Sequence, residues 1–323
     1  MNHITIRPFT PSDIPHVFAL QQAYSSVYLG VPVLPGEMYL SPAYHGGQDV
    51  FCAFLDDRLV GYAPVYAQLN EQGPADLPHV IWTEIKVLPD LPEINSVKDE
   101  LLARVIAHAQ TILRQAHTQQ GLPEQKARLM FEYRLNESEP AAYVISRGFE
   151  TGESVFSMRR DLTQPIPTIR PPDGIRLQRW RMENLPEQAQ YVAARNECFP
   201  EAPVKLEDWQ YFLSSPMWAV GTSIAAFAGD ELAGNVTVYW NPDANRQSGA
   251  QAGYTENIFV RSAWRGQGIA PAMIVEGMQY LREHGMTEAR LEVRALNENA
   301  LGLYRKLGYE VVQQSRFYGK EFL

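Results

Sequence analysis

The segment Glu256-Asn-Ile-Phe-Val-Arg-Ser-Ala-Trp-Arg-Gly-Gln-Gly-Ile-Ala-Pro271 decides how the rest of the chain is interpreted. Residues 258–260 are β-branched or aromatic, which predicts a buried strand. Gly266 and Gly268 then permit a turn whose backbone can approach a ligand closely. Pro271 suits the first turn of a helix, where backbone N–H groups have no intrahelical partner. A strand, a glycine turn and a helix start predict an anion site, most plausibly for phosphate.

Length, charge and cysteine content limit the class of protein. The 323 residues are enough for two domains, and 45% of them are hydrophobic, as in ordinary globular proteins. The net charge of −9 argues against a nucleic-acid partner, which would require a basic face. Cys52 and Cys198 lack metal-type spacing and are expected to be free thiols. Without a long apolar run or a signal core, we expect a cytoplasmic protein with no membrane partner.

Hydrophobic patterning predicts alternating strands and helices along the chain. In the first half we expect strands over residues 4–9, 50–55, 59–66 and 80–88, helices over 14–24 and 100–115, and irregular structure over 27–47. In the second half we expect a strand from residue 175, a helix over 185–198, strands over 223–228, 232–239, 253–260 and 288–294, and a polar turn over 241–250.

The order of these elements repeats, and short sequence matches follow the same order. Residues 6–15 align without gaps on 177–186, residues 57–61 align on 230–234, Val87 falls on Val260, and residues 135–137 match 296–298. The chain is therefore interpreted as a tandem repeat of one α/β unit. We expect a first domain over 1–165, a proline-rich linker over 166–174 and a second domain over 175–323.

The two copies differ at the predicted anion site. In place of the glycine turn, the first copy has Asp90-Leu-Pro-Glu-Ile-Asn-Ser-Val-Lys98, which contains no glycine. Proline removes a backbone N–H donor from this turn, and Asp90 and Glu93 would repel a phosphate. Only the second copy is expected to bind such a ligand.

A second motif follows in the same copy. Asn297 is a suitable N-cap for a short helix, Gly308 is a suitable residue just after its end, and Tyr309 supplies the apolar residue that often follows. The segment from Asn297 to Tyr309 resembles the Asn-x-x-Ala-x-x-Leu-Tyr-x-Lys-x-Gly-Phe/Tyr signature of the GCN5-related N-acetyltransferase (GNAT) family. Arg265-x-x-Gly268-x-Ala270 resembles the family's Arg/Gln-x-x-Gly-x-Gly/Ala signature.

The resemblance implies a fold class and an activity. The implied α/β (α+β) fold has two tandem acyl-CoA N-acyltransferase-like domains, each a mixed, mostly antiparallel sheet flanked by helices. A degenerate first copy and a complete second copy are similar to the tandem acetyltransferases of the mycothiol synthase type. The implied activity is transfer of an acetyl group from acetyl-CoA to a small-molecule amine, without a metal. We expect a monomer or homodimer.

The resemblance also implies roles for individual residues. Tyr304 would protonate the leaving thiolate, and its alternative role is an aromatic packing residue on a short helix. Backbone N–H groups near Phe259 and Val260 would polarise the acetyl carbonyl. The implied cofactor-binding residues are Ile258, Phe259, Val260, Arg265, Gly266, Gln267, Gly268, Ile269, Ala270, Asn297, Asn299 and Tyr304. Asn297 could also act as the N-cap alone.

The general base is less well defined by the sequence. Glu256 shares a strand face with Ile258 and Val260 unless a bulge intervenes, and it is either the base or a salt-bridged surface residue. Glu292 is the second candidate, and His284 is expected at the end of a helix. The aromatic residues Trp209, Tyr211, Phe212 and Trp218 would either line an acceptor pocket or belong to the core.

Two other functions are compatible with these motifs. A protein of this fold could bind coenzyme A or an amine as a non-catalytic sensor. It could also transfer its acyl group to a protein lysine.

Overall fold

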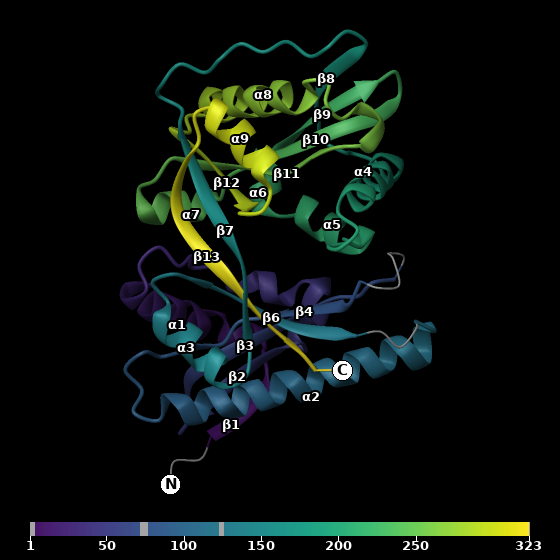
Figure 1. The fold of residues 1–323 in the computed structure, drawn as a ribbon. Helices are drawn as coiled ribbons and strands as arrows, with labels where there is room; N and C mark the ends of the chain where they lie inside the picture. Colours follow the sequence, from purple (N-terminus) through teal and green to yellow (C-terminus); the bar gives the residue numbers. More distant parts are fainter. Residues whose placement is uncertain (1–3, 72–76, 123–125, 323) are drawn as a thin grey trace. The chain divides into compact units, whose positions relative to one another are not determined.

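The computed structural model describes residues 4–71, 77–122 and 126–322, and these residues form two compact units. Unit 1 comprises Met1–Gly152 and Ser315–Leu323, and unit 2 comprises Glu153–Gln314. Each unit contains one mixed, mostly antiparallel sheet with helices packed on it (Figure 1). The predicted fold class is confirmed.

The sheet of unit 1 has the strand order β1-β2-β3-β4-β6-β13, and β5 pairs with β3. Only the β4–β6 pair is parallel. The strands are β1 (Ile4–Pro8), β2 (Val50–Leu55), β3 (Arg58–Gln68), β4 (His79–Thr83), β5 (Lys86–Val87), β6 (Ala127–Arg134) and β13 (Glu310–Glu321).

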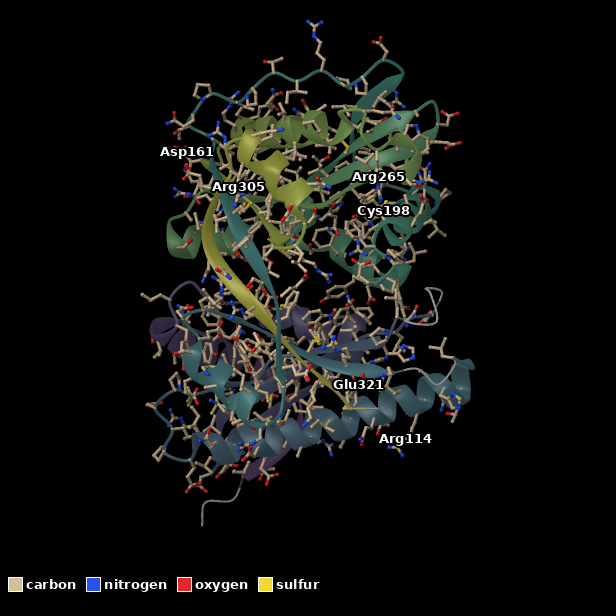
Figure 2. The ribbon with its side chains drawn as sticks, viewed as in Figure 1. Arg114, Asp161, Cys198, Arg265, Arg305 and Glu321 are labelled. Atoms are coloured by element: carbon tan, nitrogen blue, oxygen red, sulfur yellow. The ribbon has the colours of Figure 1, made fainter. Side chains whose placement is uncertain are left out.

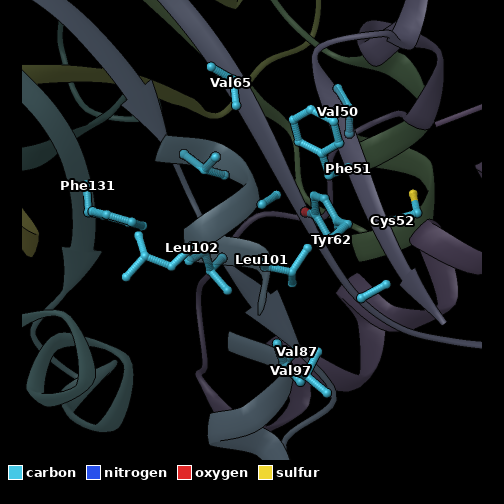
Figure 3. Packing of buried hydrophobic residues seen from close by; sticks show 14 of the residues in the cluster. Val50, Phe51, Cys52, Tyr62, Val65, Val87, Val97, Leu101, Leu102 and Phe131 are labelled. Atoms are coloured by element: carbon cyan, nitrogen blue, oxygen red, sulfur yellow. The ribbon is translucent and has the colours of Figure 1, made fainter. Parts of the chain in front are cut away.

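Helices bury the apolar side chains of this sheet. They are α1 (Ile14–Val27), α2 (Ile94–Gln120) and α3 (Ser138–Ser146), with short 3-10 helices η1 (Pro11–Asp13), η2 (Gly36–Leu40) and η3 (Pro42–Gly47). Figure 3 shows Leu101 of α2 next to Tyr62 of the sheet, and Leu102 on the side of Phe131. Burying such side chains removes apolar area from water and supplies the main stabilisation of the unit.

The sheet of unit 2 has the strand order β7-β12-β11-β10-β9-β8, in which only β11 and β12 are parallel. The strands are β7 (Glu150–Asp161), β8 (Ile175–Trp180), β9 (Thr222–Ala228), β10 (Glu231–Tyr239), β11 (Ala252–Val260) and β12 (Glu288–Arg294). The helices are α4 (Leu185–Cys198), α5 (Leu206–Leu213), α6 (Pro216–Val220), α7 (Pro242–Ser248), η4 (Ser262–Trp264), α8 (Ile269–Glu283) and α9 (Glu298–Lys306).

The two faces of this sheet have separate apolar cores. On one face Met273, Met278 and Leu281 of α8 are fully buried, together with residues of α9. On the other face Tyr191 of α4 and Trp209 of α5 pack against Phe259 and its neighbours. We call these the α8 face and the α4 face. Each candidate side chain on β11 belongs to one face or the other.

The compact units do not follow the expected sequence boundaries at residues 165 and 175. Residues 155–161 of β7, which end the first sequence copy, pair with β12 of unit 2. Residues 315–321 of β13, which end the second copy, pair with β6 of unit 1. The last strand of each copy therefore completes the sheet of the other unit. Short sequence matches cannot reveal this exchange, because strand partners are chosen by long-range pairing.

Most predicted elements are present, with differences at their limits. The helix predicted over 100–115 extends over 94–120, and the strand predicted over 80–88 is divided into β4 and β5. The polar turn predicted over 241–250 was wrong, because it contains α7. The Asn241 side chain caps this helix by accepting hydrogen bonds from Asp243 and Ala244, and Pro242 takes its first position.

Among the described residues, no helix is both long enough and apolar enough to span a bilayer. Cys52 and Cys198 are free thiols, as predicted.

We predict that replacing Leu281 of α8 by alanine destabilises unit 2 strongly. Leu281 is fully buried, so truncation leaves a cavity and lowers the free energy of unfolding by about 2–5 kcal/mol. The matched control is Leu185→Ala at the start of α4, where the side chain is 56% exposed and a change within about 0.5 kcal/mol is expected. Chemical denaturation followed by tryptophan fluorescence measures both. Equal effects of the two substitutions would contradict the assigned core.

Candidate functional site

The candidate site begins where β11 and β12 separate. The two strands pair in parallel only over Ala252–Tyr254 and Glu288–Arg290, although both continue beyond this point. On its other edge, β11 stays paired with β10 as far as Val260. The second half of β11 therefore has one edge whose backbone groups do not pair with β12. An extended ligand with its own hydrogen-bonding groups could occupy such an edge.

The backbone of Val260 faces this open edge. Val260 is paired in register with Gly234 of β10. The next residue, Arg261, donates its backbone N–H to the carbonyl of Ala233 at 2.9 Å. Backbone groups alternate in direction along an antiparallel strand, so those of Val260 point away from β10. The Val260 carbonyl accepts instead from Arg265 Nε at 2.9 Å. By the same alternation, the N–H of Phe259 faces β10. The sequence predicts the N–H groups of both Phe259 and Val260 as donors, and only that of Val260 is directed at the open edge.

A β-bulge at Asn257 changes which side chains of β11 share a face. Thr237 is opposite Glu256 and Asn235 is opposite Phe259, so β11 has one more residue than β10 in this interval. Asn257 adopts φ +47°, a left-handed conformation that asparagine tolerates better than most residues. Its side chain accepts a hydrogen bond from Arg195 Nε of α4 at 3.0 Å.

The bulge places Glu256 with Phe259 on the α4 face, while Ile258 and Val260 pack on the α8 face. The bulge that the sequence-based prediction named as the exception is therefore present, and Glu256 does not share a face with Ile258 and Val260.

The glycine turn after β11 has the conformation that its sequence predicts. Gly266 and Gly268 have φ values of +77° and +83°, which only glycine adopts at little cost. Gly268 is the N-cap of α8, and no side chain caps this helix end.

Five successive backbone N–H groups meet at this turn. Within the part of the chain that the structure describes, the N–H groups of residues 266–270 have no hydrogen-bond partner. These residues are Gly266, Gln267, Gly268, Ile269 and Ala270. Free N–H groups at the positive end of a helix dipole form a site for a phosphate or another anion.

Arg265 is anchored beside this turn. Its Nε bonds the Val260 carbonyl, and its guanidinium also interacts with the Cys198 thiol at the end of α4 (Figure 2). Arg265 thereby connects the end of β11 to the turn, and its remaining N–H groups add positive charge near the five free N–H groups.

The second sequence motif forms α9 and the turn before it. The Asn297 side chain accepts from the Ala300 N–H at 3.2 Å, so the predicted N-cap is present. Asn299 is exposed in the first turn of α9. Tyr304 is buried on the α8 face, and among the described residues its hydroxyl has no hydrogen-bond partner. Burial raises the pKa of Tyr304 to about 12, so the phenol keeps its proton at neutral pH.

Glu256 is held by a tyrosine on the adjacent strand. The hydroxyl of Tyr239 on β10 donates to Glu256 Oε2 at 2.7 Å. Burial, with a contribution from the nearby Glu292, raises the pKa of Glu256 to about 7, although the bond from Tyr239 acts in the opposite direction. A carboxyl group that titrates near neutrality is suited to take a proton from an ammonium group. The surface salt bridge considered for Glu256 is absent among the described residues.

The other candidate bases are arranged differently. Glu292 is exposed on β12 and accepts from Ser157 Oγ at 3.1 Å. His284 lies just after the last turn of α8, where its Nδ1 is 2.8 Å from the Tyr280 carbonyl. It packs against Trp240 and Tyr280, which is a helix-terminal role as predicted.

Several backbone donors of the equivalent turn in unit 1 are bonded within the turn. The Leu91 N–H donates to the Leu88 carbonyl, and the Ile94 N–H donates to the Leu91 carbonyl. At the start of α2, the Ser96 N–H donates to the Glu93 carbonyl. These internal bonds replace the free donors that characterise the turn of unit 2.

Unit 1 also differs at the strand edge and at the place of the tyrosine. Ile85, which aligns with Ile258, shares a hydrogen bond with the buried Tyr133. In α3 the place of Tyr304 is taken by Val144, and the adjacent Tyr143 donates to Asp99 at 2.7 Å. The structure therefore brings the candidate groups together in unit 2 only.

The aromatic residues before β9 are mainly core residues. Trp209 stacks on Tyr191 at 4.2 Å between ring centroids, and Trp218 is also buried. Phe212 meets the ring of Tyr239 edge to face at 5.5 Å. Of the two interpretations, the structure favours the core for the tryptophans, while Phe212 borders the Glu256 site.

The chain is similar to known proteins in its second half and in its whole fold. Residues 177–309 match the model of the acetyltransferase (GNAT) family. The second half of the chain is therefore similar to the GNAT family. A tandem GNAT protein from the clavulanic acid biosynthesis pathway, with 14% sequence identity, superposes with a TM-score of 0.68 over 99% of this chain and 98% of its own. The whole chain has the tandem GNAT fold, as predicted.

The chain is also similar to several curated proteins named mycothiol acetyltransferase. The one from Thermobispora bispora is 28% identical over 53% of this chain and 59% of its own length. The one from Acidothermus cellulolyticus is 26% identical over 93% of this chain and 88% of its own. In several matches, the chain spans only 54–62% of the length of the relative.

Two residues of the candidate site were not predicted from the sequence. Tyr239 was placed on a strand but was given no role, and Asn257 was not recognised as the bulge. A tyrosine in register with a central strand can be assigned only when the pairing of β10 and β11 is known. Among the described residues, no group of three or more histidine, cysteine, aspartate or glutamate side chains could hold a metal ion.

We predict that Gly268→Ala weakens binding of coenzyme A by about tenfold or more. The left-handed φ of Gly268 disfavours a Cβ, so the turn shifts and its N–H groups lose alignment with an anion. Gly285 after α8 is the matched control, because it has φ +84° and equally open surroundings but lies at the other end of the helix. Both variants should lose about 1 kcal/mol of stability. Isothermal titration calorimetry measures the affinities, and equal affinities for the two variants would contradict the assigned turn.

Proposed function

We propose that unit 2 transfers an acetyl group from acetyl-CoA to a primary amine of a small molecule by direct attack. The observation that carries this proposal is the row of five free N–H groups over residues 266–270 at the start of α8. They would hold the pyrophosphate of acetyl-CoA, and Arg265 would add charge-assisted contacts. The similarity of residues 177–309 to the GNAT family supports the choice of this donor.

The open edge of β11 supports the position of the acyl group. In the proposed complex the pantetheine arm lies along this edge, where β12 has separated. The Val260 N–H would then donate to the acetyl carbonyl and stabilise the negative charge that develops on its oxygen. Asn297 and Asn299 at the start of α9 would contact the cofactor from the adjacent turn.

The two faces of the sheet would supply different groups to the reaction, the base from one face and the acid from the other. Glu256 on the α4 face would accept a proton from the substrate ammonium group, leaving a neutral amine to attack the thioester carbon. Tyr304 on the α8 face would donate its proton to the leaving thiolate. The carbon–sulfur bond breaks as the amide bond forms. Because Glu256 is already protonated at this point, the nitrogen loses its second proton to water, and the Tyr304 phenolate regains a proton from solvent.

The acceptor is proposed only as a class. The net charge of −9 and the carboxylates Glu256 and Glu292 favour a cationic amine. The name of the curated relatives makes the substrate of mycothiol acetyltransferases a specific candidate within this class. Unit 1 would serve as a scaffold without a coenzyme A site, in a cytoplasmic monomer or homodimer without nucleic-acid or membrane partners.

Purified protein tests the proposal directly. Calorimetry should detect acetyl-CoA binding, and a panel of amines should release free thiol when the acceptor is present. The substrate of mycothiol acetyltransferases, aminoglycosides and a lysine peptide belong in this panel. Binding without thiol release from any amine would favour a sensor, and release with the peptide alone would favour a protein lysine. Absence of acetyl-CoA binding would overturn the proposal.

We predict that Tyr304→Phe lowers kcat by about 10²-fold or more, because the leaving thiolate loses its proton donor. Acetyl-CoA affinity should change little, since the ring stays in place. Tyr143→Phe in α3 of unit 1 is the matched control and should leave kcat unchanged, although it removes a hydrogen bond to Asp99. Steady-state thiol release measures both. A similar kcat for the two variants would exclude Tyr304 as the acid.

We predict that Glu256→Gln lowers kcat/KM by about 10²-fold or more and abolishes the acidic limb of the pH profile. A base must be ionised, and the pKa of Glu256 is raised to about 7. In the unmodified protein, kcat/KM should therefore rise as pH increases through about 7. Glu292→Gln distinguishes the second candidate base. If that substitution is the one that abolishes the limb, Glu292 is the base and Glu256 is not.

A further inference from the structure

We infer that Tyr239 is a positioning residue that holds Glu256 in the geometry of a general base, a role that rests on the proposed function. Its hydroxyl donates to Glu256 Oε2 at 2.7 Å from the adjacent strand. Neither acetyltransferase motif includes this residue, since it lies on β10, well before both of them. The inference therefore adds a third element of the sheet to the site.

The hydrogen bond distinguishes the two oxygens of the carboxylate. Oε2 is occupied by Tyr239, whereas Oε1 has no partner among the described residues. Glu256 can thus keep its bond to Tyr239 and still receive a proton from a substrate at Oε1. In this step an N–H bond of the ammonium group breaks, an O–H bond forms at Oε1, and the amine keeps the electron pair.

The ring of Tyr239 is itself fixed by aromatic neighbours. It stacks on Tyr254 of β11 with 5.5 Å between centroids and 22° between planes. Phe212 of α5 contacts it edge to face at 5.5 Å. Because its ring is packed on two sides, Tyr239 loses little side-chain entropy when its hydroxyl bonds the carboxylate. It can therefore hold Glu256 in one rotamer.

Tyr239 remains a donor over the whole range of activity. Burial, reinforced by the charge of Glu256, raises the pKa of Tyr239 well above its usual value. The phenol does not lose its proton to Glu256 and acts only through the bond that it donates. This bond favours the ionised carboxylate, which keeps the base available near neutral pH.

Other charged and titratable groups face this pair from β12 and α4. Glu292 on β12 raises the pKa of Glu256 by repulsion. Arg290 on β12 interacts with the Tyr254 phenol. The charge of Glu256 contributes to the raised pKa of Tyr191 on α4. Glu292 and Tyr239 therefore act on Glu256 in opposite directions, which provides a test.

The test is the pH profile of kcat/KM in the full-length protein. Tyr239→Phe keeps the ring packing and removes only the hydroxyl, so the acidic limb should move upward by about one pH unit. At pH 7 this shift alone lowers kcat/KM by about fivefold. Glu292→Gln should move the limb downward, because it removes a repelling charge. Tyr254→Phe removes a hydroxyl from the stacked ring and should leave the limb where it is.

The outcomes separate this inference from the proposed function. If the unmodified protein binds acetyl-CoA but releases no thiol, the proposed function fails before the variants are compared. If it is active and Tyr239→Phe lowers only the melting temperature, Tyr239 is structural and the inference is overturned. An unmoved limb in Tyr239→Phe also overturns it. An upward shift in Tyr239→Phe together with an unchanged limb in Tyr254→Phe supports it.

Discussion

The separation of β11 from β12 is the constraint on which the site depends. Buried backbone groups almost always need hydrogen-bond partners, so two strands that part inside a sheet require something else at the open edge. In unit 2 the Val260 carbonyl is bonded by Arg265, while the Val260 N–H is left facing that edge. In unit 1 the backbone of Ile85, which aligns with Ile258, bonds Tyr133. At this position a side chain of unit 1 therefore occupies part of the strand edge.

The bulge at Asn257 gives the open edge its chemistry. One extra residue in β11 moves Glu256 onto the α4 face while Ile258 and Val260 remain on the α8 face. The candidate base and acid therefore lie on opposite faces of one sheet. A single strand can in this way place a base, a polarising N–H and an anion-binding turn in succession, because the backbone fixes their order.

Unit 1 differs from the candidate site of unit 2 in several small ways rather than in one. Several donors of the turn before α2 are bonded within the turn, Tyr143 is bonded to Asp99, and Tyr133 bonds the backbone of Ile85. Each change replaces a ligand-facing group by an internal contact. Such contacts favour the packed fold, which is consistent with a unit that serves as a scaffold.

The sequence by itself determined the features that depend on local conformation. Gly266 and Gly268 are left-handed as their positions require, and Asn297 caps α9. These predictions hold because turns and caps depend on a few consecutive residues. Only the tertiary structure decided the face of Glu256, its bond from Tyr239, and the exchange of β7 and β13 between the units. Strand register and pairing depend on residues far apart in the chain, and a one-residue bulge reverses a face without leaving a clear local signal.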